Sequence, residues 1–191
     1  MRPHPIVLCL CALLLAGCAS GPEDSGAAIK ATFDAGLKAY DSGDFETAYK
    51  DWSSIEDGDL GAMRNVAVML RTGKGVQKNP KAAEDLMARA ADAGLFTAQA
   101  DLADMLLKGE AGLPNPKAAL PWLQLAAANG HPMAQFELGQ LYEQGSVVPK
   151  DIEMARKLYK DAAAGGVAEA AKRLAELPPQ PALPSNMRET Q

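Results

Sequence analysis

Acid–base catalysis is one chemistry for which this sequence has candidate side chains. The candidates are two pairs of carboxylates, Asp101 with Asp104 and Glu56 with Asp57. Paired carboxylates are the catalytic groups of most glycoside hydrolases. Carboxylates at these spacings are explained more simply as solvated helix and loop faces, so we predict that neither pair is catalytic.

The sequence also lacks the residues that metal binding and nucleophilic catalysis require. His131 is the only histidine after His4, and a general base or metal ligand at this position would have no second histidine as a partner. The sequence contains no Gly-rich phosphate loop, nucleophile elbow or Ser-x2-Lys motif. We therefore predict a protein that is not an enzyme, with no metal, no cofactor and no small-molecule substrate.

The N-terminal residues 1–17 have the pattern of an export signal. Ile6 to Leu15 is an uninterrupted apolar run of ten residues, whereas a membrane-spanning helix needs about 20. The run leads into Leu15-Ala16-Gly17-Cys18, which resembles the lipobox of bacterial lipoproteins. The alternative is an ordinary secretory signal with an incidental cysteine.

The lipobox resemblance implies that Cys18 is acylated and becomes the first residue of the mature chain. Cys9 and Cys11 would be removed with the signal, so no thiol would remain for a disulfide, a zinc site or a nucleophile. Ala19, rather than aspartate, resembles lipoproteins that are sorted to the outer membrane of Gram-negative cells. We expect a lipid-anchored envelope protein that faces the periplasm.

The net charge limits the partners that the chain can bind. The formal charge is −5, and loss of Arg2 with the signal would make the chain more negative by one unit. Nucleic acids and anionic lipid surfaces attract basic proteins. We therefore predict that neither is a general partner.

The centre of the chain, from Leu60 to Val167, repeats itself every 36 residues. Small residues keep this step, as in Ala62, Ala98 and Ala134; Gly73, Gly109 and Gly145; Ala83, Ala119 and Ala155; and Ala90, Ala126 and Ala162. A period of this length indicates one supersecondary unit that has been copied.

Each repeat is predicted to form two antiparallel helices. In the third copy, apolar residues recur at helical spacing and Gly145 follows them, which is typical of a helix end. Asn79, Asn115 and Asp151 are N-cap residues for the second helices. One hairpin cannot bury its own apolar face, so the copies are expected to stack.

The residues of the third copy resemble a known repeat family. Its pattern is Ala134-x3-Leu138-Gly139-x2-Tyr142-x2-Gly145, followed by Ala155-x6-Ala162-Ala163-x2-Gly166. This pattern is similar to the Sel-one-like repeat, a long-looped relative of the tetratricopeptide repeat, and the similarity extends over about 60–177. It implies an α-solenoid that binds other proteins.

The predicted fold is all-α, a right-handed solenoid of antiparallel helix pairs. Residues 29–177 are expected to form four units, at 29–59, 60–95, 96–131 and 132–167, and a capping helix at 168–177. The first unit is divergent, with a shorter loop. Residues 18–28 are small and polar, as in a flexible tether, and the proline-rich residues 178–191 are predicted to be an extended tail.

The first helices of stacked pairs line the concave face of such a solenoid. By register with the tetratricopeptide pattern, this face is predicted to carry Arg64, Arg71, Asp104, Leu107, Lys108, Met133, Phe136, Gln140, Glu143 and Gln144. The mixture of charged and large apolar residues favours a peptide-binding groove. The basic end at Arg64 and Arg71 and the apolar end at Phe136 predict a partner segment with acidic residues followed by a hydrophobic anchor.

Two classes of function are consistent with the sequence. The first is a membrane-anchored adaptor that holds another envelope protein, or an extended peptide segment, on its concave face. The second is an envelope hydrolase acting on peptidoglycan or β-lactams, since some proteins with similar repeats have been associated with these reactions. The first is favoured because the sequence contains no catalytic motif.

Overall fold

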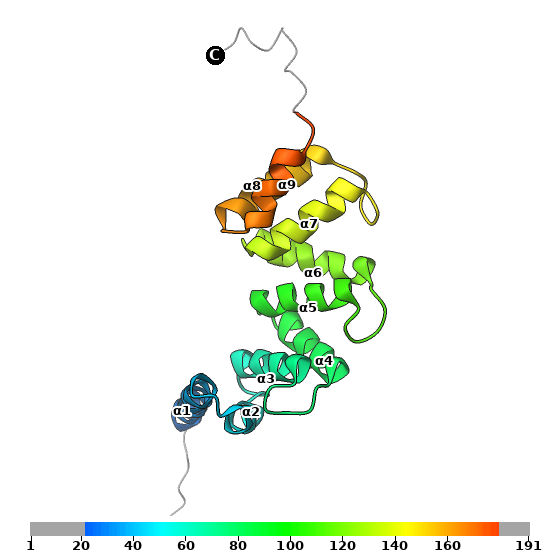
Figure 1. Ribbon diagram of the computed structural model, residues 1–191. Helices are drawn as coiled ribbons and strands as arrows, with labels where there is room; N and C mark the ends of the chain where they lie inside the picture. The colour runs from blue at the N-terminus through cyan, green and yellow to red at the C-terminus, as the bar shows by residue number, and fades with distance from the viewer. Residues whose placement is uncertain (1–21, 180–191) are drawn as a thin grey trace, which may run out of the picture.

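The computed structural model describes residues 22–179, and within them all regular secondary structure is α-helical. The helices are α1 (Pro22–Asp41), α2 (Phe45–Ser53), α3 (Leu60–Thr72), α4 (Pro80–Asp92), α5 (Phe96–Lys108), α6 (Pro116–Ala128), α7 (Pro132–Gln144), α8 (Ile152–Ala164) and α9 (Ala168–Glu176). They stack in chain order, with α1 and α9 at opposite ends (Figure 1). The predicted all-α solenoid of four hairpins and a capping helix is confirmed.

The helices fall into two sets, which we call A helices (α1, α3, α5, α7 and α9) and B helices (α2, α4, α6 and α8). Each A helix packs on the B helix that follows it, each B helix packs on the next A helix, and α5 also contacts α7. The buried apolar residues form three clusters along the stack. Each unit therefore depends on its neighbours for burial, as expected of a solenoid.

The predicted caps position the B helices. The side chains of Asn79, Asn115 and Asp151 each accept a hydrogen bond from a backbone amide three residues later, at 3.1, 3.1 and 2.9 Å. The backbone N–H of each cap residue also donates to a carbonyl near the end of the preceding A helix. Gly73, Gly109 and Gly145 end the A helices with φ of 77°, 67° and 72°, a left-handed conformation that strongly favours glycine.

Close approach of the two helices in a hairpin requires a small residue on the A helix. In the last hairpin, a Cβ atom added to Gly139 would lie 2.7 Å from Cε1 of Tyr159, whose side chain is fully buried. One repeat earlier, the equivalent positions are occupied by buried Ala103 and Leu123. The larger residue on the B helix is thus matched by the smaller residue on the A helix.

The N-terminal boundary differs from the prediction. Helix α1 begins at Pro22, so part of the segment 18–28, which was predicted to be a tether, is helical. Proline is favourable at a first helical position because its φ is already helical, and Ala27 and Ala28 have the highest helix propensity. Within residues 22–179, no helix is both long and apolar enough to cross a membrane. Residues 1–21, including the signal segment and Cys18, and residues 180–191 lie outside the described residues.

We expect Gly139→Ala to lower the free energy of unfolding by about 1–3 kcal/mol, because the added methyl group would overpack against the buried Tyr159 ring. At an unconstrained helical position, the same change would stabilise the helix by up to about 1 kcal/mol. Chemical denaturation of the parent and the variant measures the difference.

The double variant Gly139→Ala/Tyr159→Leu is the control, because it reproduces the residue pair of the preceding repeat. Its loss of unfolding free energy should be smaller than the sum of the losses in the two single variants. Strictly additive losses would show that the two residues do not limit the approach of α7 to α8.

Candidate protein-binding site

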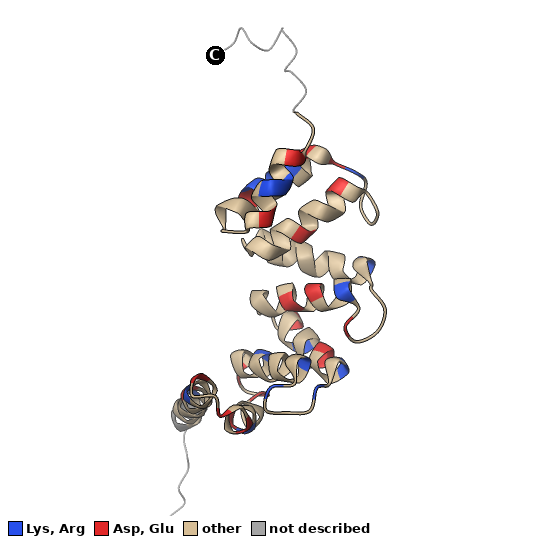
Figure 2. Cartoon of the chain, viewed as in Figure 1, with Lys and Arg blue, Asp and Glu red and all other residues tan. Residues whose placement is uncertain are grey.

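A pocket of about 370 Å³ opens between helices α5 and α7. It is lined by Ala100, Asp101, Asp104, Lys108, His131, Met133, Ala134 and Glu137. Acidic positions on both α5 and α7 are visible in Figure 2. We call the surface that the neighbouring helices α3, α5, α7 and α9 share the A-helix face.

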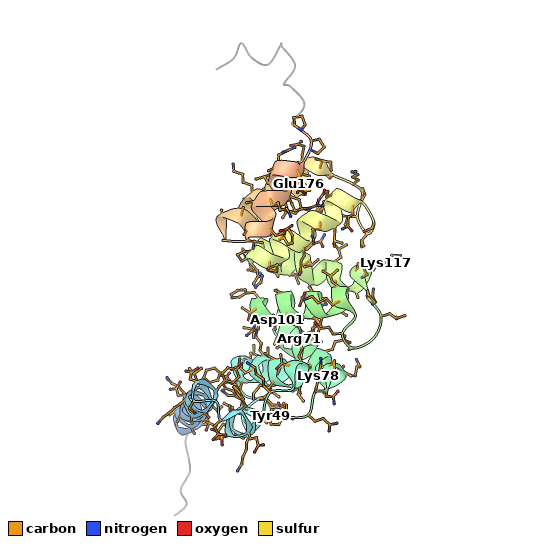
Figure 3. The ribbon with its side chains drawn as sticks, in the orientation of Figure 1. Tyr49, Arg71, Lys78, Asp101, Lys117 and Glu176 are labelled. Carbon is orange, nitrogen blue, oxygen red and sulfur yellow. The ribbon has the colours of Figure 1, made fainter. Side chains whose placement is uncertain are left out.

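Ion pairs between successive A helices hold one side of this pocket in place. Nη2 of Arg64, on α3, lies 2.6 Å from Oδ2 of Asp101, on α5, and Nη2 of Arg71 lies 2.5 Å from Oδ2 of Asp104. Figure 3 labels Arg71 and Asp101, which lie where α3 and α5 face each other. The two aspartate side chains are only 24% and 20% exposed, so the sequence-based interpretation of a solvated pair is wrong.

Arg71 joins three segments of the chain. Its guanidinium donates to both carboxylate oxygens of Glu110, at 2.7 and 2.5 Å, as well as to Asp104. The hydrogen bond to Glu110 raises the pKa of Arg71, although burial opposes the change. Burial also works against the charged form of Asp104, but hydrogen bonds from Lys108 and Arg71 lower the pKa of this carboxyl overall. Asp104 is therefore ionised, with Arg71 and Lys108 as its ion-pair partners.

Glu137 is the carboxylate of this pocket whose environment is least favourable to charge. Burial, followed by the neighbouring charge of Asp104, raises the pKa of Glu137 to about 7, although Lys108 and Arg71 act in the opposite direction. Within residues 22–179, Glu137 forms no ion pair, and Arg71 and Lys108 are both paired with Asp104. Glu137 is thus poised to gain or lose a proton near neutral pH.

His131 and Met133 complete the pocket at the start of α7. Nδ1 of His131 accepts a hydrogen bond of 3.3 Å from the backbone amide of Ala134, so His131 is the N-cap of α7. Met133 is 45% exposed and gives the pocket an apolar side. Sequence analysis predicted Met133 as a binding residue but gave no such role to His131.

The prediction that Phe136 forms an apolar end of the groove is wrong. Phe136 is only 9% exposed, and its ring centroid lies 5.7 Å from that of Tyr159 within the last core cluster. Glu143 accepts a hydrogen bond of 2.6 Å from the Tyr159 hydroxyl and pairs with Arg173 of α9 at 3.0 Å. Both residues are used internally, because this part of α7 is covered by α8 and the capping helix.

The prediction of a basic end that attracts an acidic partner is also wrong, because Arg64 and Arg71 are already paired with carboxylates of this chain. Arg64 is paired with Asp101, and Arg71 with Asp104 and Glu110. Of the remaining predicted residues, Leu107 packs against the second core cluster, Gln140 is half-buried, and Gln144 is exposed. None of these three lines the pocket between α5 and α7.

The pocket therefore combines the predicted residues Asp104, Lys108 and Met133 with residues such as His131 and Glu137, which were not predicted to bind a partner. The missed residue that matters most is Glu137. A signal for it exists in the repeat, because Asn65, Asp101 and Glu137 stand 36 residues apart and keep this position polar in successive copies.

The other acidic pair does not form a comparable site. Asp57 is exposed and lies 2.5 Å from Nη2 of Arg89, on the B helix α4. Burial, followed by the charge of Asp57, raises the pKa of Glu56. Among the residues described here, no group of three or more His, Cys, Asp or Glu side chains is arranged to hold a metal ion.

Comparison with known proteins gives both a family match and similar structures. The model of the Sel1 repeat matches residues 61–95, 97–131 and 132–167. A Sel1 repeat protein from Oxalobacter formigenes is 27% identical with a TM-score of 0.70, and the match covers 75% of this chain and 59% of that one. A search of curated proteins by sequence gives no match.

A second similar structure is c5321, a protective antigen of uropathogenic Escherichia coli strains that displays an SLR fold. It is 26% identical with a TM-score of 0.73, and the match covers 80% of this chain and 34% of that one. The Pseudomonas aeruginosa protein PA5086 is 27% identical with a TM-score of 0.52, over 78% of this chain and 57% of that one. This chain thus spans about a third to three fifths of the length of these similar structures.

The raised pKa of Glu137 predicts a pH-dependent stability. The folded chain holds this proton up to a pH of about 7, whereas an unfolded glutamate releases it near 4.5, so ionisation of Glu137 destabilises the fold as the pH rises through this range. Glu137→Gln should raise the free energy of unfolding by about 1–3 kcal/mol at pH 8, with most of the gain lost by pH 4.5. Urea denaturation at both pH values measures this.

Glu169→Gln, on the exposed surface of α9, is the matched control. Its pair with Lys172 is solvent-exposed, so the change should be below about 0.5 kcal/mol at either pH. An equal effect of Glu137→Gln at pH 4.5 and pH 8 would contradict the electrostatic description of the pocket.

Proposed function

The chain belongs to the Sel1 repeat family, and on this basis we propose that it is a lipid-anchored adaptor of the bacterial cell envelope. Sel1 repeat proteins are helical-repeat scaffolds for protein–protein interaction. In this proposal Cys18 carries the lipid, and the A-helix face binds an extended segment of another envelope protein.

The observation that carries the binding part of this proposal is the pocket between α5 and α7. Its floor is buried Ala100 and Ala134, and exposed Met133 stands beside charged groups. A partner side chain could therefore bury apolar surface and make polar contacts in the same place. The ion pairs between α3 and α5 hold the pocket in shape before a partner arrives, which reduces the cost of ordering it on binding.

The anchoring part of the proposal rests on the sequence before the described residues. Leu15-Ala16-Gly17-Cys18 resembles a lipobox, and three residues separate Cys18 from the first residue of α1. A link of this length reaches on the order of 10 Å, so an acylated Cys18 would keep the solenoid near the bilayer. Ala19 supports the outer membrane as the site of attachment.

An envelope hydrolase is the alternative, and one observation favours it. Asp104 and Glu137 are neighbouring carboxyls with pKa values shifted in opposite directions, as in many acid–base pairs. However, Arg71 and Lys108 both contact the Asp104 carboxylate, which leaves it poorly placed to act as a base. Turnover of labelled peptidoglycan by the parent, lost in Glu137→Gln, would favour the hydrolase.

We test the adaptor with a photo-crosslinking amino acid at Met133, in cells that make the protein. Leu125, on α6, is the matched control, because it is 47% exposed compared with 45% for Met133 but lies on a B helix. We expect the Met133 probe to crosslink to one envelope protein and the Leu125 probe to give no such product. The reverse pattern would place the binding surface on the B helices.

Cys18→Ser is introduced into the same strains to test the anchor. Without the thiol no acyl chain can attach, so the protein should remain unprocessed or leave the membrane fraction, and the Met133 crosslink should weaken. Incorporation of a palmitate analogue that survives Cys18→Ser would refute lipidation at this residue.

A further inference from the structure

The charged groups around the α5–α7 pocket do not balance when all of them are ionised. The carboxylates are Asp101, Asp104, Glu110 and Glu137, and the cations are Arg64, Arg71 and Lys108. Asp101, Asp104 and Glu110 all have cation partners, while Glu137 has none within the described residues. His131 also lines the pocket, where its Nδ1 accepts a hydrogen bond from the backbone amide of Ala134.

We propose that this pocket binds a lysine or arginine side chain of the partner, with its charged group placed between Glu137 and Asp104. This inference rests on the proposed function and names the chemistry of the partner segment. It reverses the sequence-based expectation of an acidic segment, which depended on Arg64 and Arg71 being free. Both arginines are already occupied by carboxylates of this chain.

The shape of the pocket suits a long side chain with a polar end. Met133 is exposed and offers apolar surface for the methylene groups of lysine or arginine, and the buried Ala100 and Ala134 line the pocket beside it. The Glu137 carboxyl lines the same pocket, next to Asp104. A bound cation would supply the positive charge that Glu137 lacks and would replace carboxylate repulsion by attraction.

Binding of a cation should favour the ionised form of Glu137 and so release a proton. With a pKa of about 7 in the free protein, about a tenth of Glu137 is ionised at pH 6 and about nine tenths at pH 8. If only the ionised form binds, the affinity should be about tenfold weaker at pH 6 than at pH 8. Histidine also changes charge in this range, so His131→Asn, which keeps an N-cap residue, is included as a comparison.

The test is selection from a random nine-residue peptide library on the purified protein. We expect enrichment of peptides that carry Lys or Arg next to an apolar residue. Glu137→Gln should weaken a selected peptide by about tenfold or more and remove most of its pH dependence. His131→Asn changes a lining residue and so can alter the affinity itself, but the ratio of the affinities at pH 6 and pH 8 should survive this substitution. Glu137→Lys should favour acidic peptides instead, and the matched Glu84→Lys on α4 should leave the selection unchanged.

The outcomes separate this inference from the proposed function. One possible outcome is that the enriched peptides have no basic residue and that the bulky Met133→Trp substitution blocks their binding. This outcome would contradict the proposal of a bound lysine or arginine but would still support the adaptor function. Basic peptides that bind Glu137→Gln as well as the parent would also overturn the inference. If no peptide is enriched and the Met133 probe captures no envelope protein, the proposed function itself fails. Glu137→Gln is an isosteric change, so the test remains informative if Glu137→Lys fails to fold.

Discussion

The close approach of the two helices in each hairpin is the constraint on which the rest of this structure depends. Gly139 leaves space for the Tyr159 ring, and Ala103 and Leu123 occupy the equivalent positions one repeat earlier. Small residues at these crossings fix how far each A helix stands from its B helix. Because the units are copies, the same spacing recurs along the stack and brings successive A helices side by side.

The ion pairs of the A-helix face follow from this placement. Arg64 and Arg71 of α3 reach aspartates of α5, and Arg173 of α9 reaches Glu143 of α7. These pairs use charges that sequence analysis assigned to a partner. Between α5 and α7, the cations Lys108 and Arg71 pair with Asp104, and none of the described residues forms an ion pair with Glu137. This is where the pocket opens.

The local features of the fold could be predicted from the sequence because they depend on neighbouring residues. Asn79, Asn115 and Asp151 cap their helices through amides three residues away, and Gly145 ends a helix through its own backbone conformation. The repeat period then gave the number of helices. The start of α1 could not be predicted, since the small polar residues before Ile29 are compatible with both a tether and a helix.

The site was less predictable because it depends on contacts between residues far apart in the chain. Arg71 and Glu110 are separated by 39 residues, and no local pattern indicates that they pair. Phe136 was assigned to the groove by repeat register, but equivalent positions are not equally covered: Arg64 reaches the next unit, whereas Phe136 is enclosed by the final units. The pKa of Glu137 is raised by burial and by the charge of Asp104, on α5, and neither cause can be read from the residues next to Glu137 in the sequence.

In the proposed complex, Glu137 is the carboxylate that pairs with a cation of the partner. Carbon NMR of the Glu137 side-chain carboxyl, titrated in the free protein and with a bound lysine-containing peptide, tests it most directly. We expect a pKa of about 7 in the free protein and a clearly lower value in the complex. A pKa near the ordinary 4.5 in the free protein, unchanged by the peptide, would contradict this account.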